Sequence, residues 1–419
     1  MNQSENRKSP VRRGAPAPAS REEAREQRKL RREKTRNFMT SGSSVRYRGG
    51  IDRPMLVLII LLLCYGTVMV FSASYVFALQ REGDSYYYIV RQLLFAVAGV
   101  ATMLGVSLID YRIIQYWTPV VFLGVSLLLL VTPFFGIAQG VARRWLIIGP
   151  IRFQPSELMK PMLVLMLAWY YARYQNIIMR RDNFWRCSMY SLFIPFMIVG
   201  FVCFLIFLEN HFSCMVIMFL IGLVVIWAGG AVKIWFALAG AGAGVVSLFA
   251  IMFSSYARER IDIWLHPEKY SADDEVWQTI QGLNAVGSGG FFGVGLGNSR
   301  QKHLYVAEPQ NDFIFSILCE ELGFVGALSV IVLFVLFVVR GYHIAMNAPS
   351  TFSSLMVMGL VGKVAIQAVL NMAVVTAMIP NTGIALPFFS YGGTALLVQL
   401  AEMGLILNVS RYSVREVPQ

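Results

Sequence analysis

Charged residues are scarce in this 419-residue chain: Asp, Glu, Lys and Arg make up 14% of it, whereas hydrophobic residues make up 56% and the mean hydropathy is +0.58. A soluble domain could not bury so much apolar surface, so the composition excludes a soluble globular protein. The apolar residues form runs long enough to cross a bilayer. Together these features predict a polytopic membrane protein.

Cysteine and histidine are also scarce, and neither is spaced for metal or redox chemistry. The five cysteines show no CxxC spacing and lie in or beside apolar runs, where they are interpreted as small core residues. The four histidines form no cluster, which argues against a zinc site held by the protein. No GKS or GKT sequence follows the glycines near residue 290, so a nucleotide-binding P-loop is excluded.

Long apolar runs predict ten transmembrane helices. Each run has about 17–25 residues, as a hydrocarbon core of roughly 30 Å requires. Backbone groups in lipid must be paired within their own segment, so the predicted fold class is all-α. The runs lie near residues 55–77, 92–109, 117–136, 157–173, 189–208, 212–229, 231–254, 312–339, 352–379 and 391–409.

The distribution of basic residues predicts that both termini are cytoplasmic. The N-terminal tail, Arg112, the stretch from Arg173 to Arg186 and the end at Arg411 all fall on one side of a ten-span protein. The predicted organisation is a cytoplasmic tail at 1–53, a membrane domain at 54–411 and a short cytoplasmic tail at 412–419.

Residues 1–53 hold most of the formal net charge of +12 and are expected to be mostly disordered. Attraction to anionic lipid explains this charge better than nucleic acid does, because no aromatic residue for base stacking precedes Phe38.

One connection, residues 255–311, is much longer than the others and lies outside the membrane in this topology. A connection of that length in a compact protein is usually functional. The run from Gly287 to Gly323 adds glycines, which permit close backbone approach, and carboxylates, which are expected to hold the eighth span. Asp312 is interpreted either as the N-cap of that span or as a catalytic group.

Other polar residues are predicted to meet at the outer ends of the spans. Arg143, Arg144 and Arg152 lie in an outer connection, where Arg is disfavoured; either an anion retains them or a short loop tolerates a few charges. Glu157 and Lys160 share a helix face at the start of the fourth span, either as functional groups or as a structural pair. The polar segment NTGIALPFFSYGG before the last span is typical of a broken helix that lines a cavity.

Four blocks, GVARRWLIIGPIRFQPSELMK, GSGGFFGVGLGNSRQK, EPQNDFIFSILCEELGFVG and TGIALPFFSYGG, resemble signatures of the SEDS (shape, elongation, division and sporulation) family of bacterial cell-wall polymerases. The resemblance covers nearly all of the chain after the tail, and SRQK and EPQNDFIF are more similar to the FtsW and SpoVE branch than to RodA. It implies an enzyme that polymerises lipid II outside the cell membrane, at the division septum or in sporulation. It also implies a class B penicillin-binding protein and other division or sporulation proteins as partners.

The family resemblance implies a general base in the long outer loop, an Asp shortly before an aromatic–Gln pair. Here the pair is Trp277–Gln278, and Asp273 fits the spacing, with Asp274 as the alternative. Such a carboxylate would take a proton from the attacking sugar hydroxyl. The surrounding SADDEVWQ departs from the DPxGxGYQ-like segment of many relatives, and a merely solvated acidic run is the other interpretation.

Further residues are expected to bind substrate. Pyrophosphate departs with growing negative charge, which basic side chains or an assisting Mg²⁺ or Mn²⁺ ion could stabilise, although no cofactor is required by the sequence. The candidates are Arg143, Arg144 and Lys160 for pyrophosphate, Glu157 for orienting Lys160 or substrate, Gln278, Asn298 and Gln301 for sugar or peptide, and Ser390 in the last outer loop. In LENHFSCM, Asn210 and His211 replace the Pro–Asp of relatives, so no role of that Asp is transferred.

Two other functions are compatible with this architecture. A lipid flippase or transporter would also need many spans and ionisable residues, but no inverted repeat is evident and the charged positions lie at outer ends. A scaffold that recruits a penicillin-binding protein without polymerising glycan is the third hypothesis, because of the altered Asp loop.

Overall fold

The computed structural model describes residues 50–139, 142–148, 151–180, 184–232, 235–236, 262, 264–266, 269 and 274–412. Most of the expected disordered tail, nearly all of the predicted seventh span and the candidate base Asp273 therefore lie outside the described residues. The remaining chain is almost entirely helical, as predicted.

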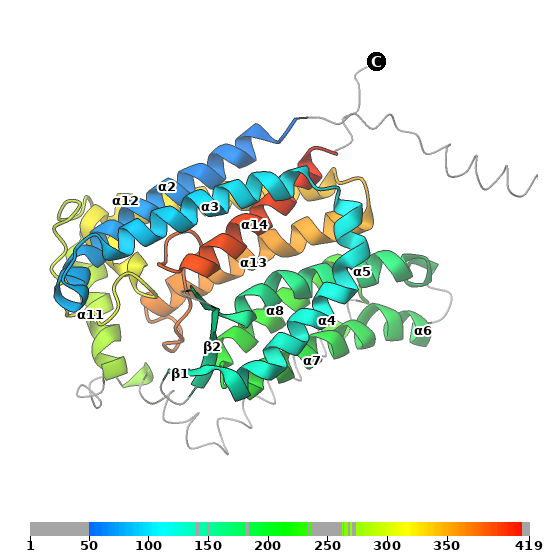
Figure 1. The fold of residues 1–419 in the computed structure, drawn as a ribbon, viewed down its shortest axis with the longest axis horizontal. Coiled ribbons are helices and arrows are strands. Elements are labelled where there is room, and N and C mark those ends of the chain that lie inside the picture. Colours follow the sequence, from blue (N-terminus) through cyan, green and yellow to red (C-terminus); the bar gives the residue numbers. More distant parts are fainter. Residues whose placement is uncertain are drawn as a thin grey trace, which may run out of the picture. The chain divides into compact units, whose positions relative to one another are not determined.

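Twelve helical segments and three strands follow one another along the described residues (Figure 1). The helices are α2 (Arg53–Glu82), α3 (Tyr87–Leu108), α4 (Tyr111–Phe135), α5 (Pro155–Arg180), α6 (Phe184–Ser188), the π-helical η1 (Met189–Phe193), α7 (Ile194–Leu208), α8 (Phe212–Ala228), α11 (Asp274–Ser288), α12 (Ile314–Met346), α13 (Thr351–Val375) and α14 (Gly393–Ser410). The strands are β1 (Ile137–Gln139), β2 (Ala142–Ile148) and β3 (Ile151–Phe153).

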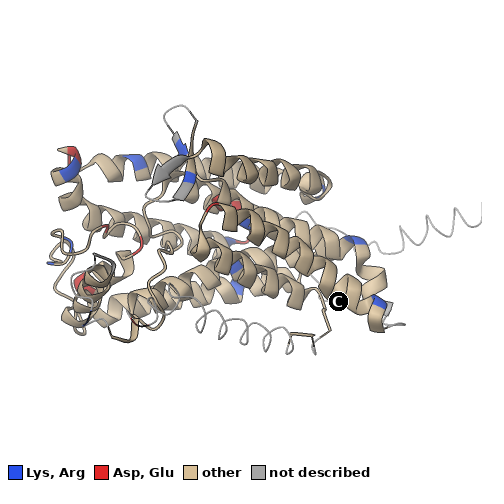
Figure 2. Ribbon diagram, turned by 90° about the horizontal axis from the view of Figure 1, so that it is seen from below, with Lys and Arg blue, Asp and Glu red and all other residues tan. Residues whose placement is uncertain are grey.

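Seven helices in the described part of the chain are long and apolar enough to cross a membrane, with α6 to α7 counted as one, and α8 is a shorter apolar helix. Charged residues are sparse along them (Figure 2). Several helices extend beyond the apolar runs. For example, α2 begins where the Asp52 side chain accepts a hydrogen bond from the Met55 amide and ends where Gly83 adopts φ 74°. Hydropathy marks the part of a helix that suits lipid, whereas caps decide where the helix ends.

The helices pack through small residues where they approach most closely. In Figure 1, α14 runs beside both α3 and α13. A Cβ on Gly99 would lie 2.4 Å from a methyl carbon of Leu400, and one on Gly404 would lie 2.5 Å from the carbonyl oxygen of Met103. Glycines at these positions let α3 and α14 approach each other, as is common between helices in lipid.

A small antiparallel sheet, ordered β1-β2-β3, interrupts the all-α pattern between α4 and α5. Ile137 pairs with Trp145 and Leu146 pairs with Phe153. The sequence analysis treated this connection only as a loop, because its strands are too short to give a distinct pattern. The sheet is joined to α14 by the Thr394 hydroxyl, which donates to the carbonyl of Arg152.

The long outer connection contains a helix, α11, that the sequence analysis did not identify. Its buried residues Gln281, Gly282 and Ala285 mark the side that packs, and α11 contacts α12. The intervals of three and four residues that separate Gly282 and Gln281 from Ala285 put these three residues on one helix face.

Candidate functional site

The connections between helices place most of the predicted polar residues at one end of the bundle, which we call the loop-rich end. It contains the sheet, the first turns of α5, the α7–α8 turn, α11 and the segments that precede α12 and α14. The helix order brings these segments to the same end, since successive helices run in alternating directions.

The predicted pair of Glu157 and Lys160 is formed at the start of α5. Lys160 Nζ lies 2.6 Å from Glu157 Oε1, and the exposed fractions of the two side chains are 5% and 20%. A spacing of three residues puts both groups on one helix face. A buried ammonium and its mostly buried carboxylate are thereby held in a fixed geometry.

A second charged pair lies close to the first, and the sequence analysis missed it. Lys363 of α13 donates to both carboxylate oxygens of Glu402 of α14, at 2.7 and 2.8 Å, and to Gln399 at 2.7 Å. Lys363 interacts electrostatically with Glu157, and Glu402 does so with Lys160. The signal for this pair was available: an ionisable residue within an apolar span is costly, so it is rarely retained without a role.

The α7–α8 turn supplies the residues that surround the first pair. Arg144 Nη2 of β2 donates to the carbonyl of Asn210 at 2.6 Å, and the Gln154 amide lies 3.4 Å from His211 Nδ1. Arg144, Lys160 and Glu157 all interact electrostatically with His211. The structure thus brings Arg144, Glu157 and Lys160 together around His211.

Burial changes the protonation of two groups in this turn. Burial, with the Arg144 and Lys160 charges, lowers the pKa of His211 to about 3 although Glu157 opposes this. Burial raises the pKa of Glu209 to about 8, and the nearby Arg144 limits the rise. At neutral pH the imidazole is therefore neutral and the Glu209 carboxyl is largely protonated, so positive charge dominates beside Arg144 and Lys160.

The part of the Gly287–Gly323 run that precedes α12, called here the glycine-rich run, is held against the first turns of α12 by two glutamates of that helix. Lys302 Nζ lies 2.8 Å from Glu321 Oε1, with both side chains fully buried, and Ser72 donates to Glu321 at 2.5 Å. Glu320 accepts from the Ser299 hydroxyl at 2.5 Å and from the Arg300 amide at 2.9 Å. These contacts agree with the expectation that the carboxylates hold the eighth span.

Close backbone approach explains the glycines of this run. Gly323 has φ 66°, and a Cβ there would lie 2.3 Å from the backbone nitrogen of Gly293. A Cβ on Gly289 would lie 1.9 Å from the carbonyl oxygen of Cys319. The run and α12 can therefore pack backbone against backbone.

Three predicted substrate-binding residues lie in α11 and the glycine-rich run. Gln278 is half-buried on α11, next to Trp277, whose indole donates to the Tyr305 carbonyl. Asn298 is exposed, and its side-chain amide donates to the Val294 carbonyl. The backbone amide of Gln301 donates to the Glu320 carboxylate.

Of the remaining predicted residues, the structure describes the side chain of Ser390 but only the backbone of Arg143 and Asp274. The Ser390 hydroxyl accepts from the Leu386 amide and donates to the Asn311 carbonyl, so it braces the segment before α14. Arg143 pairs with Ala138 through the sheet backbone, and Asp274 begins α11; the side chains of both lie outside the described residues.

The interpretation of Asp312 as an N-cap is wrong. Helix α12 begins at Ile314 with Phe313 as its cap, because the chain before it is held by the Asn371 amide, which donates to the Asp312 carbonyl. The Asp312 carboxylate instead faces Gly383, where a Cβ would lie 2.8 Å from Oδ2. Burial, with the nearby Glu308 charge, raises the pKa of Asp312 to about 6.

No group of three or more His, Cys, Asp or Glu side chains that could hold a metal occurs in the ranges that the structure describes. This part of the chain contributes bases, carboxylates and amides to the site.

The chain is similar to characterised proteins over nearly its whole length. Residues 53–415 match the family described as cell cycle protein, FtsW, RodA and SpoVE. The chain is 38% identical over 366 residues to stage V sporulation protein E of Bacillus subtilis (strain 168), covering 86% of this chain and 97% of that protein. It is 36% identical over 370 residues to the probable peptidoglycan glycosyltransferase FtsW of Geobacter sp. (strain M18), with the same coverage of each.

Two solved structures share the fold. One is a chain of a peptidoglycan synthase complex that coordinates polymerization and crosslinking, with TM-score 0.70, 25% identity and coverage of 86% of this chain and 98% of that chain. The other is the rod shape determining protein RodA of Thermus thermophilus, with TM-score 0.63, 25% identity and coverage of 87% and 98%.

Proposed function

Because the chain belongs to the FtsW, RodA and SpoVE family of cell cycle proteins, we propose that it is a peptidoglycan glycosyltransferase that polymerises lipid II at the outer face of the cell membrane. The observation that carries this proposal is the buried Glu157–Lys160 pair beside Arg144 at the loop-rich end. Fixed positive charge in a partly desolvated site suits a departing pyrophosphate.

The chemistry assigns different roles to the loop and to the cluster around His211. The acceptor sugar hydroxyl attacks the anomeric carbon of the donor, forming the new C–O bond and giving its proton to Asp273, with Asp274 as the alternative base. The bond between that carbon and the pyrophosphate oxygen breaks, and the electron pair stays with pyrophosphate. Arg144 and Lys160, with Arg143, stabilise that charge, while Glu157 holds Lys160.

Substrate contacts complete the proposal. Gln278 and Asn298 present amides, and Gln301 has an unpaired buried side-chain oxygen, on the side of α11 and the glycine-rich run. These groups suit hydrogen bonds to the sugar or the peptide of the substrate. Ser390 instead holds the backbone of the segment before α14 through its hydroxyl. A divalent ion, Mg²⁺ or Mn²⁺, could supplement the basic side chains, but the roles above need none.

The location and partners follow from the same proposal. Ten spans, with the seventh near 231–254, place both termini in the cytoplasm and the loop-rich end outside, where lipid II is used. A class B penicillin-binding protein would cross-link the product at the septum or in sporulation, with further division or sporulation proteins. The likeness to a chain of a peptidoglycan synthase complex that couples polymerization and crosslinking supports such a partner.

The test is polymerisation of labelled lipid II by the purified full-length chain with its penicillin-binding protein. We expect glycan from the wild type and at least a ~10²-fold loss for Asp273→Ala, the scale of a general base. Asp274→Ala tests the alternative, and Glu275→Ala is the matched control in the same acidic run.

Each outcome separates the hypotheses. Full activity in both Asp273→Ala and Asp274→Ala would overturn the base assignment. No glycan from the wild type under any partner condition would favour the scaffold, and translocation of labelled lipid II across vesicles without polymer would favour the flippase.

A further inference from the structure

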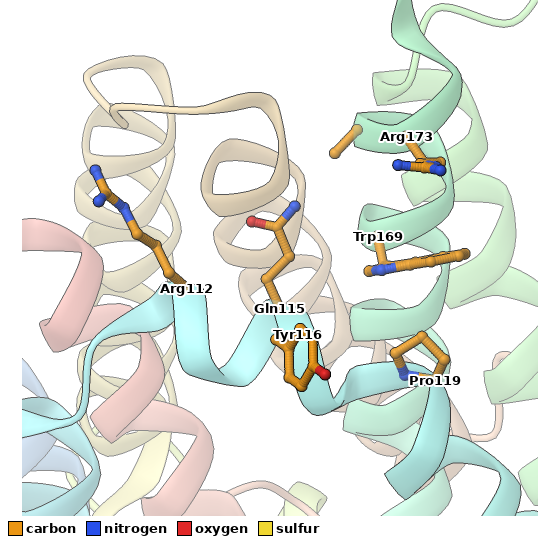
Figure 3. Close-up of a pocket in the computed structure, with 7 residues that line it drawn as sticks. Arg112, Gln115, Tyr116, Pro119, Trp169 and Arg173 are labelled. Carbon is orange, nitrogen blue, oxygen red and sulfur yellow. The ribbon is translucent and has the colours of Figure 1, made fainter.

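A pocket of about 580 Å³ opens between α4 and α5, at the end of the bundle opposite the loop-rich end. Arg112 is in the first turn of α4 and Arg173 is near the end of α5, so both lie at this end of the bundle. Figure 3 shows Arg112, Gln115, Tyr116 and Pro119 projecting from α4 and Trp169 and Arg173 from α5. The pocket shares no residue with the proposed active site.

The pocket contains two positive charges and no carboxylate among its lining residues. Arg112 and Arg173 are both exposed, and neither guanidinium makes a hydrogen bond or ion pair with another residue in the described ranges. Asp110, the N-cap that precedes α4, accepts from the backbone amide of Arg112. A guanidinium without an acidic partner suits a phosphate or another anionic group of a headgroup, and the pocket has one at each side.

The remaining walls suit an amphipathic ligand. Trp169 and Tyr116 carry aromatic rings with a polar tip, the residue types that concentrate at the membrane–water boundary. Further along α4, Val120 is 58% exposed and Leu123 is 66% exposed, so an apolar surface continues from the pocket toward the membrane centre. The first turn of α4 adds the partial positive charge of a helix N-terminus.

We propose that this pocket binds the headgroup of an anionic phospholipid, with Arg112 at one side of the headgroup, Arg173 at the other, and the acyl chains along the exposed face of α4. Basic pockets between transmembrane helices on the cytoplasmic side are typical of such lipid sites. A soluble phosphate would satisfy the arginines but not the aromatic and aliphatic walls. The lipid would fix α4 against α5, whose opposite end carries Glu157 and Lys160.

The experiment is lipid binding to the delipidated full-length protein in detergent, followed by native mass spectrometry. The probes are dioleoyl phosphatidylglycerol and dioleoyl phosphatidylcholine, which share acyl chains and differ in headgroup charge. We expect phosphatidylglycerol to bind at least about tenfold more tightly, since each basic residue contributes roughly 1 kcal/mol toward an anionic lipid surface. Arg112→Gln/Arg173→Gln should remove most of that preference and leave phosphatidylcholine binding unchanged.

Matched variants keep the result interpretable. Arg53→Gln removes one exposed positive charge at the same end of the bundle without touching the pocket, so it should retain the preference. Arg112→Lys/Arg173→Lys keeps the charge and should retain part of it. If the double Gln variant fails to fold, the single variants Arg112→Gln and Arg173→Gln are measured instead, and each is expected to lose about fivefold in affinity for phosphatidylglycerol.

Three results would overturn the proposal. They are equal binding of the two lipids by the wild type, an equal loss in Arg53→Gln and the pocket variants, or displacement of phosphatidylglycerol by an equal concentration of inorganic phosphate. The last result would assign the pocket to a soluble anion.

Discussion

At the scale of single residues, Lys160 is the side chain on which the proposed chemistry depends most. It is almost fully buried, and Glu157 holds its ammonium group at 2.6 Å. If the Lys160 ammonium were removed, the Glu157 carboxylate would lose its counter-charge.

We expect Lys160→Met to lower the rate of lipid II polymerisation by about 10²-fold or more, the cost of losing one group that stabilises developing charge. Lys269→Met is the control, since Lys269 is an exposed lysine whose contact with Asp262 is a loose 4.0 Å. Equal rates in wild type and Lys160→Met would remove Lys160 from the mechanism.

A second residue-scale effect concerns pH. The pKa of Glu209 is raised by burial from an ordinary 4.5 to about 8 in the fold. The protonated carboxyl is therefore favoured by folding, and its contribution is complete below about pH 4.5 and is lost as the pH rises through 8.

The melting temperature in detergent should consequently fall between about pH 5 and pH 8 more steeply for the wild type than for Glu209→Gln, where the amide cannot ionise. Intrinsic tryptophan fluorescence measures both curves. Parallel curves would show that Glu209 ionises freely in the fold.

At the scale of elements, the glycine-rich run and α12 act as one unit. Their backbones are in close contact at Gly293 and Gly323. The buried Lys302–Glu321 ion pair also links the run to α12. Such packing leaves no room for a side chain at the contact.

Gly323→Ala should lower the melting temperature markedly and reduce polymerisation. Its φ of 66° with ψ of −161° costs an L-residue roughly 1–3 kcal/mol, and its Cβ would meet the Gly293 backbone at 2.3 Å. Gly287→Ala is the matched control, because nothing lies within 4 Å of its Cβ position in α11. The unit is looser than described if the two variants melt alike.

At the scale of the whole membrane domain, buried charge joins helices that are distant in sequence. Lys363, Gln399 and Glu402 connect α13 to α14, and their electrostatic contact with Glu157 and Lys160 extends the connection to α5. Charged side chains within the spans therefore interact with the Glu157–Lys160 pair of the proposed site.

Lys363→Met should destabilise the domain by about 3–5 kcal/mol, because it leaves the Glu402 carboxylate buried without its counter-charge. The double variant Lys363→Met/Glu402→Gln removes both charges and should recover most of the melting temperature. Thermal melts of the two variants in one detergent make the comparison, and a double variant no more stable than the single would contradict the coupling.

Sequence reasoning succeeded for residues close together and failed for those far apart. The Glu157–Lys160 pair follows from a spacing of three on a helix. The Lys363–Glu402 pair depends on how α13 and α14 are packed, so it was missed. The N-cap alternative for Asp312 was wrong because α12 begins at Ile314 with Phe313 as its cap, and a tertiary hydrogen bond from Asn371 holds the Asp312 carbonyl.

By itself, the sequence determined that this is a helical membrane protein of the FtsW, RodA and SpoVE family, because hydropathy and local motifs are properties of contiguous residues. Only the tertiary structure decided that Arg144, Glu157 and Lys160 gather around His211, that Glu320 and Glu321 fasten the glycine-rich run, and that a basic pocket lies between α4 and α5. The physical reason is that contacts between separate helices depend on their packing and relative rotation, which no single segment specifies.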